Sequence, residues 1–263
     1  MGLFSRDKSV LRDMSSQTVA ILGARGGVGS TTFAVSLAKE LADNSKRVLY
    51  VDFHLDRPTA YHYLGVDPEK LKEHVLPGLK KARINLEDMM IGTGYAKIKL
   101  LTIDDLVPLG SALEVVMSTC ELLLETAASK FDVVIIDCDS NIYAETTIAA
   151  LRKCDYLFTV TDSDITMLPY LLKLKAYISA ITGKDKMQYI IQNKVINRKY
   201  TIDQLDAIGV RSFAEQYYSQ TIAQCGNELE IPLNDKSMDA ECKEFRETVR
   251  EIIHFIGSNL TAT

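Results

Sequence analysis

The sequence contains no apolar run that approaches the roughly 18 residues needed to cross a bilayer. Its N-terminus, MGLFSRDKSVLRDMSSQ, has charges every few residues and no apolar core, which excludes a secretory signal peptide. Gly2 matches the start of a myristoylation motif, but Arg6 replaces the serine or threonine that this motif requires. We therefore expect a cytoplasmic protein without direct membrane insertion, placed at a membrane or cell pole only through partners.

Cysteine pairs of the C-x-x-C type are also absent. The five cysteines are an odd number, and neither this number nor their spacing suits a disulfide framework or a zinc site. We expect reduced and mostly buried thiols.

A strong net charge is lacking as well. The formal net charge of -5 gives no global reason to expect binding to nucleic acid or to a membrane surface. One local patch is basic, and we expect a solvated face there rather than a nucleic-acid site. Its residues are Lys184, Lys186, Lys194, Arg198 and Lys199.

Short apolar runs rich in valine, isoleucine and leucine recur along the chain, and segments with helical spacing separate most of them. The runs span residues 18–24, 47–53, 99–103, 132–138, 156–162, 188–195 and 228–233. They lack polar alternation, as strands covered on both faces do. The pattern predicts an α/β fold with a doubly wound, mainly parallel sheet that binds ligands at the carboxyl ends of its strands. We place one domain at residues 17–263 after a flexible tail over 1–16.

A glycine-rich segment, GARGGVGSTT at 23–32, follows the first predicted strand and opens a helix. Gly26, Gly27 and Gly29 let the backbone approach a phosphate, and the helix N-terminus adds N–H donors with a partial positive charge. The segment departs from the phosphate-loop form G-x-x-x-x-G-K-[ST] because Ser30 occupies the lysine position. A strand-to-helix turn that binds nothing is the alternative.

The segment FDVVIIDCDS at 131–140 supports a nucleotide site. It predicts a buried strand that ends near Asp137, where a carboxylate reaches a magnesium ion directly or through water. Aspartates at such places also cap helices, so this motif gains its weight from the glycine-rich loop upstream.

Together, GARGGVGSTT, VLYVDFHLDRP and FDVVIIDCDS resemble the deviant-Walker ATPases of the MinD and ParA superfamily. The loop is most similar to that of the CpaE/TadZ branch, whose members help to place and assemble Flp (Tad) type IV pili. The resemblance extends over residues 17–256 and implies a P-loop NTPase sandwich of three layers. It also implies bound ATP or ADP with Mg²⁺, a nucleotide-stabilised homodimer, and pilus or secretion machinery at the inner membrane as partners. Relatives often carry a receiver-like domain before the first strand, which we expect to be missing here.

The resemblance assigns roles by position. It implies that the phosphates are bound by the loop and the start of the helix, at Gly26, Gly27, Val28, Gly29, Ser30, Thr31 and Thr32. The Thr31 hydroxyl faces magnesium, and Asp137 contacts the metal through its bound water.

Four further positions carry implied roles. Arg25 replaces the signature lysine that reaches the partner's phosphates in a dimer, and an arginine keeps that charge. Asp52 is the first aspartate of the switch I region. Asn193 and Pro232 lie in segments that resemble the adenine side, although a strand-end or turn role is open for each.

The departures from the family pattern decide what chemistry remains. Ser30 removes a cation from the phosphates, Ala24 fills a position that is usually glycine, and His54 stands where relatives have the aspartate that orients the attacking water. Losing one charge-assisted contact costs roughly 1.5–3 kcal/mol, or about ten- to a hundredfold in affinity. A missing cation of the arginine-finger kind costs about 10³–10⁵ in rate. We therefore predict that ATP binds but is hydrolysed slowly or not at all.

Other functions stay open. An active MinD/ParA-like ATPase in division-site or cargo positioning requires another basic residue to replace the charge missing at Ser30. A bacterial tyrosine kinase of the polysaccharide-export type is disfavoured, since the chain ends in SNLTAT rather than in a tyrosine cluster. His54 is either a water-activating base or, more simply, a surface residue.

Two helical features have simpler explanations. An apolar stripe near the C-terminus carries mixed charges on its other face, which favours core packing over membrane binding; it consists of Phe245, Val249, Ile252, Ile253 and Ile256. Asp56 is expected to cap a helix that Pro58 opens.

Overall fold

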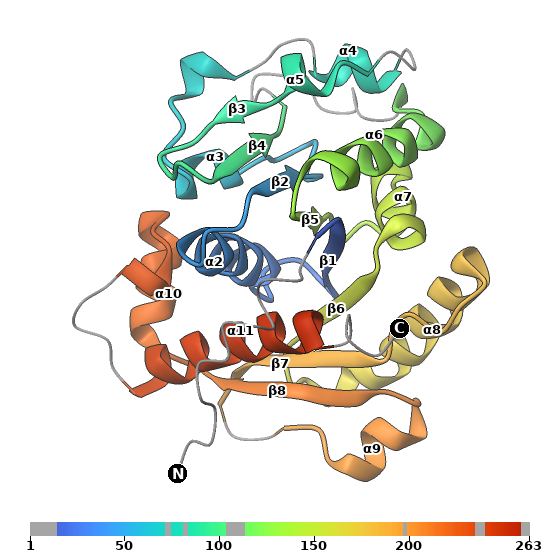
Figure 1. Ribbon diagram of the computed structural model, residues 1–263. Helices are drawn as coiled ribbons and strands as arrows, with labels where there is room; N and C mark the ends of the chain where they lie inside the picture. Colours follow the sequence, from blue (N-terminus) through green and yellow to red (C-terminus); the bar gives the residue numbers. More distant parts are fainter. Residues whose placement is uncertain are drawn as a thin grey trace.

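The computed structural model describes residues 15–71, 75–80, 84–103, 114–196, 199–234 and 240–258. Its strands are β1 (Gln17–Gly23), β2 (Val48–Asp52), β3 (Ile91–Gly92), β4 (Ile98–Leu101), β5 (Val133–Cys138), β6 (Tyr156–Thr161), β7 (Tyr189–Val195) and β8 (Arg211–Tyr217). They form one sheet in the order β3-β4-β2-β5-β1-β6-β7-β8 (Figure 1). Only the β3–β4 pair is antiparallel within these residues, so the predicted mainly parallel sheet is confirmed.

Helices cover both faces of this sheet (Figure 1). The longer ones are α2 (Ser30–Asp43), α6 (Met117–Lys130), α7 (Glu145–Lys153), α8 (Leu168–Thr182), α10 (Gln220–Glu228) and α11 (Ala240–Ser258). The shorter ones are α3 (Ala60–Tyr63), η1 (Pro68–Lys70), α4 (Val75–Lys80), α5 (Leu86–Met89), η3 (Ile165–Met167), α9 (Ile202–Ala207) and η4 (Pro232–Asn234). The division into a tail over 1–16 and a single domain stays a prediction, because residues 1–14 lie outside the described part of the chain.

The core is split into two layers by the sheet, as β1 illustrates. Val19 and Ile21 belong to the layer with α2 and α11, whereas Ala20 and Leu22 belong to the layer with α6 and α7. Because both faces of the central strands are covered, these strands need apolar residues at every position, which explains the continuous apolar runs.

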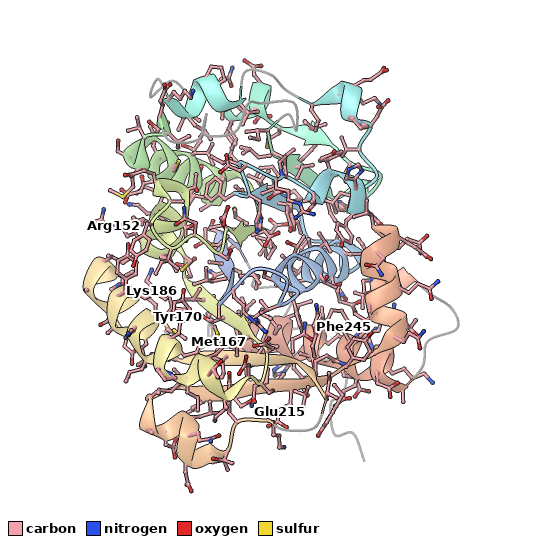
Figure 2. The ribbon with its side chains drawn as sticks, turned by 180° about the vertical axis from the view of Figure 1, so that it is seen from behind. Arg152, Met167, Tyr170, Lys186, Glu215 and Phe245 are labelled. Carbon is pink, nitrogen blue, oxygen red and sulfur yellow. The ribbon has the colours of Figure 1, made fainter. Side chains whose placement is uncertain are left out.

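The C-terminal apolar stripe packs in the core, as predicted. Its five residues on α11 are all buried, among them Phe245, which Figure 2 labels. The Phe245 ring lies 4.7 Å from that of Phe33 on α2, centroid to centroid. Since α2 follows the glycine-rich loop, this contact fixes the helix whose N-terminus faces the candidate site.

The expected strand over 228–233 is wrong. Residue Glu228 ends α10, Leu229 takes a positive φ of 57°, and Pro232 begins η4. The apolar residues of that run are buried, because Ile231 and Leu233 pack in the α2–α11 layer without joining the sheet. Strands β3 and β8, which form the two edges of the sheet, were missed.

Other expectations can be compared directly. All five cysteines are buried, and none of them forms a disulfide bond, as predicted. Among the described residues, no helix is both long and apolar enough to cross a membrane. The strands β1, β2 and β5 lie side by side, and their register places Asp52 at the end of β2 opposite Asp137 of β5.

Candidate functional site

The glycine-rich loop joins β1 to α2 through residues 24–29. Gly27 and Gly29 have φ values of 79° and 96°, a region that residues with side chains rarely adopt. A Cβ atom at Gly29 would lie 2.5 Å from the Asn193 side-chain nitrogen, whereas Cβ atoms at Gly26 and Gly27 would meet nothing within 4 Å in the described part of the chain. The loop therefore needs glycine at position 29 and leaves its backbone open at positions 26 and 27.

Two residues of β7 donate side-chain hydrogen bonds to backbone carbonyls of this loop. The Asn193 side-chain nitrogen donates to the Val28 carbonyl at 2.7 Å, and the Lys194 ammonium donates to the Gly27 carbonyl at 2.7 Å. Lys194 reaches the loop from a positive φ of 56°. The structure thus brings Asn193 to the loop, and it adds Lys194, which the sequence placed only in the basic patch.

Several lysines of the basic patch form hydrogen bonds or ion pairs within the chain. Lys186 donates to the carbonyls of Arg152 and Cys154 at 2.9 and 2.7 Å (Figure 2), and Lys199 pairs with Glu215 at 2.5 Å. Arg198 lies outside the described residues.

The first turn of α2 offers hydroxyl groups and backbone amides. Gly29 is the helix N-cap and makes no side-chain capping bond, and Ser30, Thr31 and Thr32 are all partly buried. The Thr31 hydroxyl lies near Asp137, where it lowers the pKa of that carboxyl group against the larger effect of burial. Helix N-terminal amides of this kind bind anions.

Arg25 lies at the outer edge of the loop. Its guanidinium forms a salt bridge with Asp162, and its side chain is 51% exposed. The hydrogen bond that it donates to Asp162 raises the pKa of Arg25. The charge of Arg25 is thus held by its own chain, at a position from which a neighbouring molecule can reach it.

An acidic centre lies at the carboxyl ends of β2 and β5. The Asp52 and Asp137 side chains are buried, and His54 Nδ1 lies 3.0 Å from Asp52 Oδ1 and 3.6 Å from Asp137 Oδ2. The Tyr50 hydroxyl donates to Asp137 Oδ2 at 2.9 Å. Sequence reasoning missed both Tyr50 and the approach of His54 to Asp137.

The protonation of this centre follows from burial and charge. Burial raises the pKa of Asp137, the His54 charge lowers it and Asp52 raises it, with a net rise to about 6. Burial lowers the pKa of His54, but Asp137 and Asp52 raise it more strongly, to about 10. The raised pKa favours the protonated form of His54 at neutral pH, which makes this partly buried residue a poor proton acceptor for an attacking water molecule.

Asp52 also fixes the start of α3. Its Oδ2 atom accepts hydrogen bonds from the backbone nitrogens of Thr59 and Ala60, at 3.2 and 3.1 Å. The expected capping role of Asp56 is wrong, because Thr59 is the N-cap and α3 begins at Ala60. Asp52 therefore couples the acidic centre to the segment after β2.

Pro232 lies at the start of η4, which packs against α2 and α11. The structure shows this packing role, and an adenine contact at Pro232 stays a prediction.

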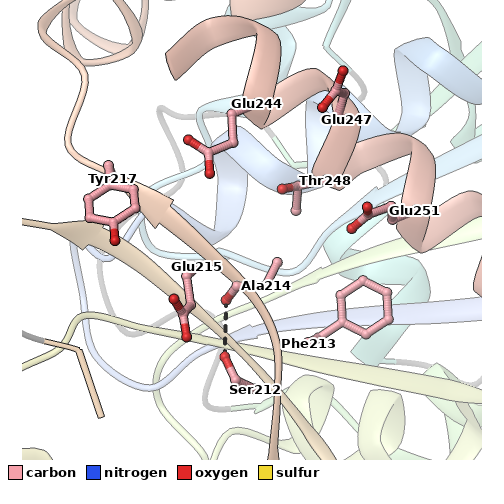
Figure 3. A pocket seen from close by; sticks show the side chains of 9 residues that line it. All are labelled: Ser212, Phe213, Ala214, Glu215, Tyr217, Glu244, Glu247, Thr248 and Glu251. Carbon is pink, nitrogen blue, oxygen red and sulfur yellow. Dashed lines mark hydrogen bonds between the residues drawn. The ribbon is translucent and has the colours of Figure 1, made fainter. Parts of the chain in front are cut away.

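A separate hollow of about 400 Å³ lies between β8 and α11 (Figure 3). Its carboxylates are Glu215 on β8 and Glu244, Glu247 and Glu251 on α11. Burial and the charges of neighbouring glutamates raise the pKa of Glu244. A site with this charge repels phosphate groups, so the glycine-rich loop is the better candidate for binding a nucleotide.

Comparison with known proteins agrees with this geometry. The family model described as an AAA domain (AAA_31) matches residues 16–192. A segment of 83 residues is 35% identical to the antiactivator FleN of Pseudomonas aeruginosa and covers 31% of this chain and 28% of FleN. An alignment of 186 residues is 27% identical to an ATP-binding protein of Methanocaldococcus jannaschii and covers 68% of this chain and 64% of that protein. The chain thus spans less than two thirds of the length of either relative.

Solved structures share the fold over nearly their whole length. The septum site-determining protein MinD of Pyrococcus horikoshii, complexed with Mg-ADP, has a TM-score of 0.76 at 20% identity, covering 92% of this chain and 98% of that chain. A ParA family ATPase of Chlorobium tepidum has a TM-score of 0.72 at 18% identity, covering 90% and 99%. The chain therefore belongs to the AAA_31 family of AAA domains and has the fold of the MinD and ParA P-loop ATPases.

Proposed function

We propose that this protein binds ATP with Mg²⁺ and hydrolyses it slowly or not at all, and that bound nucleotide stabilises a homodimer that acts as a localisation or assembly factor of the CpaE/TadZ kind. The observation that carries the proposal is that the site keeps features for binding a nucleotide but lacks features for hydrolysing it. The positive φ values of Gly27 and Gly29 support a phosphate-binding loop, while Ser30 and His54 stand at two positions to which the resemblance assigns groups used for hydrolysis.

The described residues fit a nucleotide with magnesium. Gly27 and Gly29 shape the loop, and the amides of α2 follow it directly. Asp137 Oδ1 is buried and makes no hydrogen bond with the described part of the chain, although the Thr31 hydroxyl is near. Thr31 and Asp137 are the residues that would hold Mg²⁺, which neutralises phosphate charge when bound.

Slow hydrolysis follows from the electrostatics of the centre. A water molecule that attacks a phosphate needs an acceptor to orient it, and phosphoryl transfer needs cations around the developing charge. The imidazolium of His54 accepts no proton at neutral pH, and Ser30 brings no charge. The site therefore keeps groups that bind and lacks groups that accelerate the reaction.

Relatives support the nucleotide part of this proposal. One is described as ATP-binding and one structure holds Mg-ADP. FleN is described as an antiactivator. An active MinD/ParA-like ATPase is the second candidate, since Lys194 and Arg25 both lie at the loop as cations. We extend the CpaE/TadZ role to this chain on the likeness of its loop, with pilus or secretion machinery as partners.

The dimer can be tested through Arg25. We expect sedimentation velocity to show a dimer with ATP and Mg²⁺ and a monomer without nucleotide. In the dimer, the guanidinium of Arg25 leaves Asp162 and pairs with the partner's phosphates. The Arg25→Ala variant should therefore form a dimer that is at least tenfold weaker. Arg25→Lys should retain part of the effect.

The matched control is Arg47→Ala, since Arg47 is also exposed and paired with one aspartate, Asp132, at 2.8 Å. This variant should dimerise like the wild type. A chain that stays monomeric with ATP, or a dimer indifferent to Arg25, contradicts the proposed assembly mode.

A further inference from the structure

The hollow between β8 and α11 gathers negative charge at one edge of the sheet (Figure 3). In the described part of the chain β8 is the last strand, so no further strand closes this side. The four carboxylates that line the hollow come from both elements, and its volume is about 400 Å³. A volume of this size lies within the range of ligand-binding pockets.

The charges of α11 are sorted between its sides. Its two arginines bond away from β8: Arg246 donates to a carbonyl of η4 at 2.6 Å, and Arg250 donates to a glutamate of α2 at 2.7 Å. Glu244, Glu247 and Glu251 face the hollow and form no salt bridge with any described residue. Like charges three and four positions apart on a helix repel one another, and a bound cation relieves that repulsion.

A buried hydroxyl in the same hollow also points to a ligand. Thr248 lines the hollow between Glu244 and Glu251, and only 5% of this residue is exposed (Figure 3). Its hydroxyl forms no hydrogen bond with the residues that the structure describes. By contrast, the hydroxyls of Thr126 and Thr182, which also lie in helices, donate to the carbonyl four residues earlier at 2.7 Å. A buried hydroxyl without a partner is costly, so Thr248 is available to accept a hydrogen bond from a ligand.

The arrangement suits an organic cation better than a metal ion. In the described structure, no three carboxylates of the hollow have oxygen atoms within 4.8 Å of one another, whereas a metal ion needs its ligands close together. The Tyr217 ring, in a residue that is 44% exposed, lines the same hollow. Guanidinium and ammonium groups pair with carboxylates and also lie over aromatic rings, so basic side chains match both kinds of group.

The chain itself already places a basic side chain here. The Lys199 ammonium pairs with Glu215 at 2.5 Å, on the β8 side of the hollow. This pair uses one of the four carboxylates and leaves the three on α11 without a cation. The hollow is thus compatible with lysine side chains and has capacity for more of them.

We propose that the hollow binds a segment of a partner protein that is rich in lysine and arginine. The basic groups of this segment pair with Glu244, Glu247 and Glu251, and one of its N–H groups donates to the Thr248 hydroxyl. Charge complementarity selects this occupant, because an acidic surface attracts and orients a basic partner. The hollow shares no residue with the glycine-rich loop or the acidic centre, so the inference does not rest on the proposed function.

The test is the fluorescence anisotropy of a labelled peptide of alternating glycine and arginine, titrated with the full chain at low ionic strength without nucleotide. We expect saturable binding that weakens as NaCl is added, and no binding of a peptide of alternating glycine and glutamate. Spermidine should displace the peptide only in large excess. Absence of saturable binding, or displacement by spermidine at equal concentration, overturns the proposal.

Substitutions locate the site. Glu244→Gln should weaken peptide binding at least about threefold, because it removes one charged contact. Thr248→Val should weaken it about two- to tenfold, because it removes one hydrogen bond. The matched control is Glu69→Gln, since Glu69 is an exposed glutamate of η1 outside the hollow, and it should bind like the wild type. Unchanged affinity for Glu244→Gln, or an equal loss in the control, overturns the assignment.

Removing the chain's own cation tests the site in the opposite direction. Lys199→Ala should tighten peptide binding about two- to fivefold, because Glu215 becomes available to the peptide. Lys130→Ala is the matched control, since Lys130 pairs with Glu87 at 2.9 Å outside the hollow and its loss changes the net charge equally. This control should bind like the wild type. Equal tightening in both variants indicates non-specific attraction, and that result or unchanged affinity for Lys199→Ala contradicts the proposal.

Discussion

Replacing Ser30 with lysine is expected to tighten the binding of ATP with Mg²⁺ by about ten- to a hundredfold. Ser30 is the first residue of α2, and the loop before it already has the glycine conformations that bring amides to phosphates. A lysine there adds one charge-assisted contact, which contributes roughly 1.5–3 kcal/mol. Because Cβ positions at Gly26 and Gly27 face open space in the described structure, a long side chain can lie along the loop.

The measurement is a titration with a fluorescent ATP analogue at fixed ionic strength. Ser129→Lys is the matched control, since Ser129 is an exposed serine in the last turn of α6 and gains the same charge away from the loop. This control should bind nucleotide like the wild type. Equal affinity for Ser30→Lys and wild type means that the phosphates do not lie at the start of α2.

Replacing His54 with glutamine is expected to lower the free energy of unfolding by about 3–5 kcal/mol at pH 7, because it leaves two buried carboxylates without their cation. The effect should depend on pH. The pKa of His54 is raised from 6.5 to about 10 in the folded protein. A raised histidine pKa stabilises the fold fully below the unfolded value and loses this contribution as pH rises towards the folded value. The gap between wild type and variant should therefore shrink from pH 7 to pH 10.

Urea unfolding at both pH values, with EDTA present, measures this gap. Burial also raises the pKa of the buried thiols Cys120, Cys138 and Cys154, so both proteins lose stability at high pH, but that loss cancels in the difference. His62→Gln should match the wild type at each pH. A gap that is absent, or that stays constant from pH 7 to pH 10, shows that His54 is not the cation of this centre.

The central strands were predictable because burial on both faces forces a continuous apolar run. The edge strand β8 was not, since most of its residues, as in RSFAEQY, are only partly buried and the segment has no such run. The strand wrongly predicted at 228–233 has the same origin, because that prediction also relied on a run of apolar residues. Ile231 and Leu233 are buried, yet the positive φ at Leu229 and the missing N–H of Pro232 keep that segment out of the sheet. An apolar run therefore indicates that its residues are buried, but it does not by itself indicate that they form a strand.

The site was partly predictable for a related reason. The glycine-rich loop is local in sequence, so its positive φ values at Gly27 and Gly29 could be anticipated from residue type. The ion pair of His54 with Asp137 depends on β2 and β5 being neighbours, which is a property of strand order and not of either segment. Lys194 was missed because its bond to the Gly27 carbonyl joins two segments far apart in sequence, and a lysine near a strand end is usually solvated.

The most direct test of slow hydrolysis is the steady-state rate of phosphate release by the full chain with Mg²⁺, at ATP concentrations that a parallel titration shows to saturate the site. The loop geometry predicts saturable binding, and the replacements at Ser30 and His54 predict a turnover number well below about 1 s⁻¹. A turnover of about 1 s⁻¹ or more that Asp137→Ala abolishes would contradict the account and identify an active ATPase.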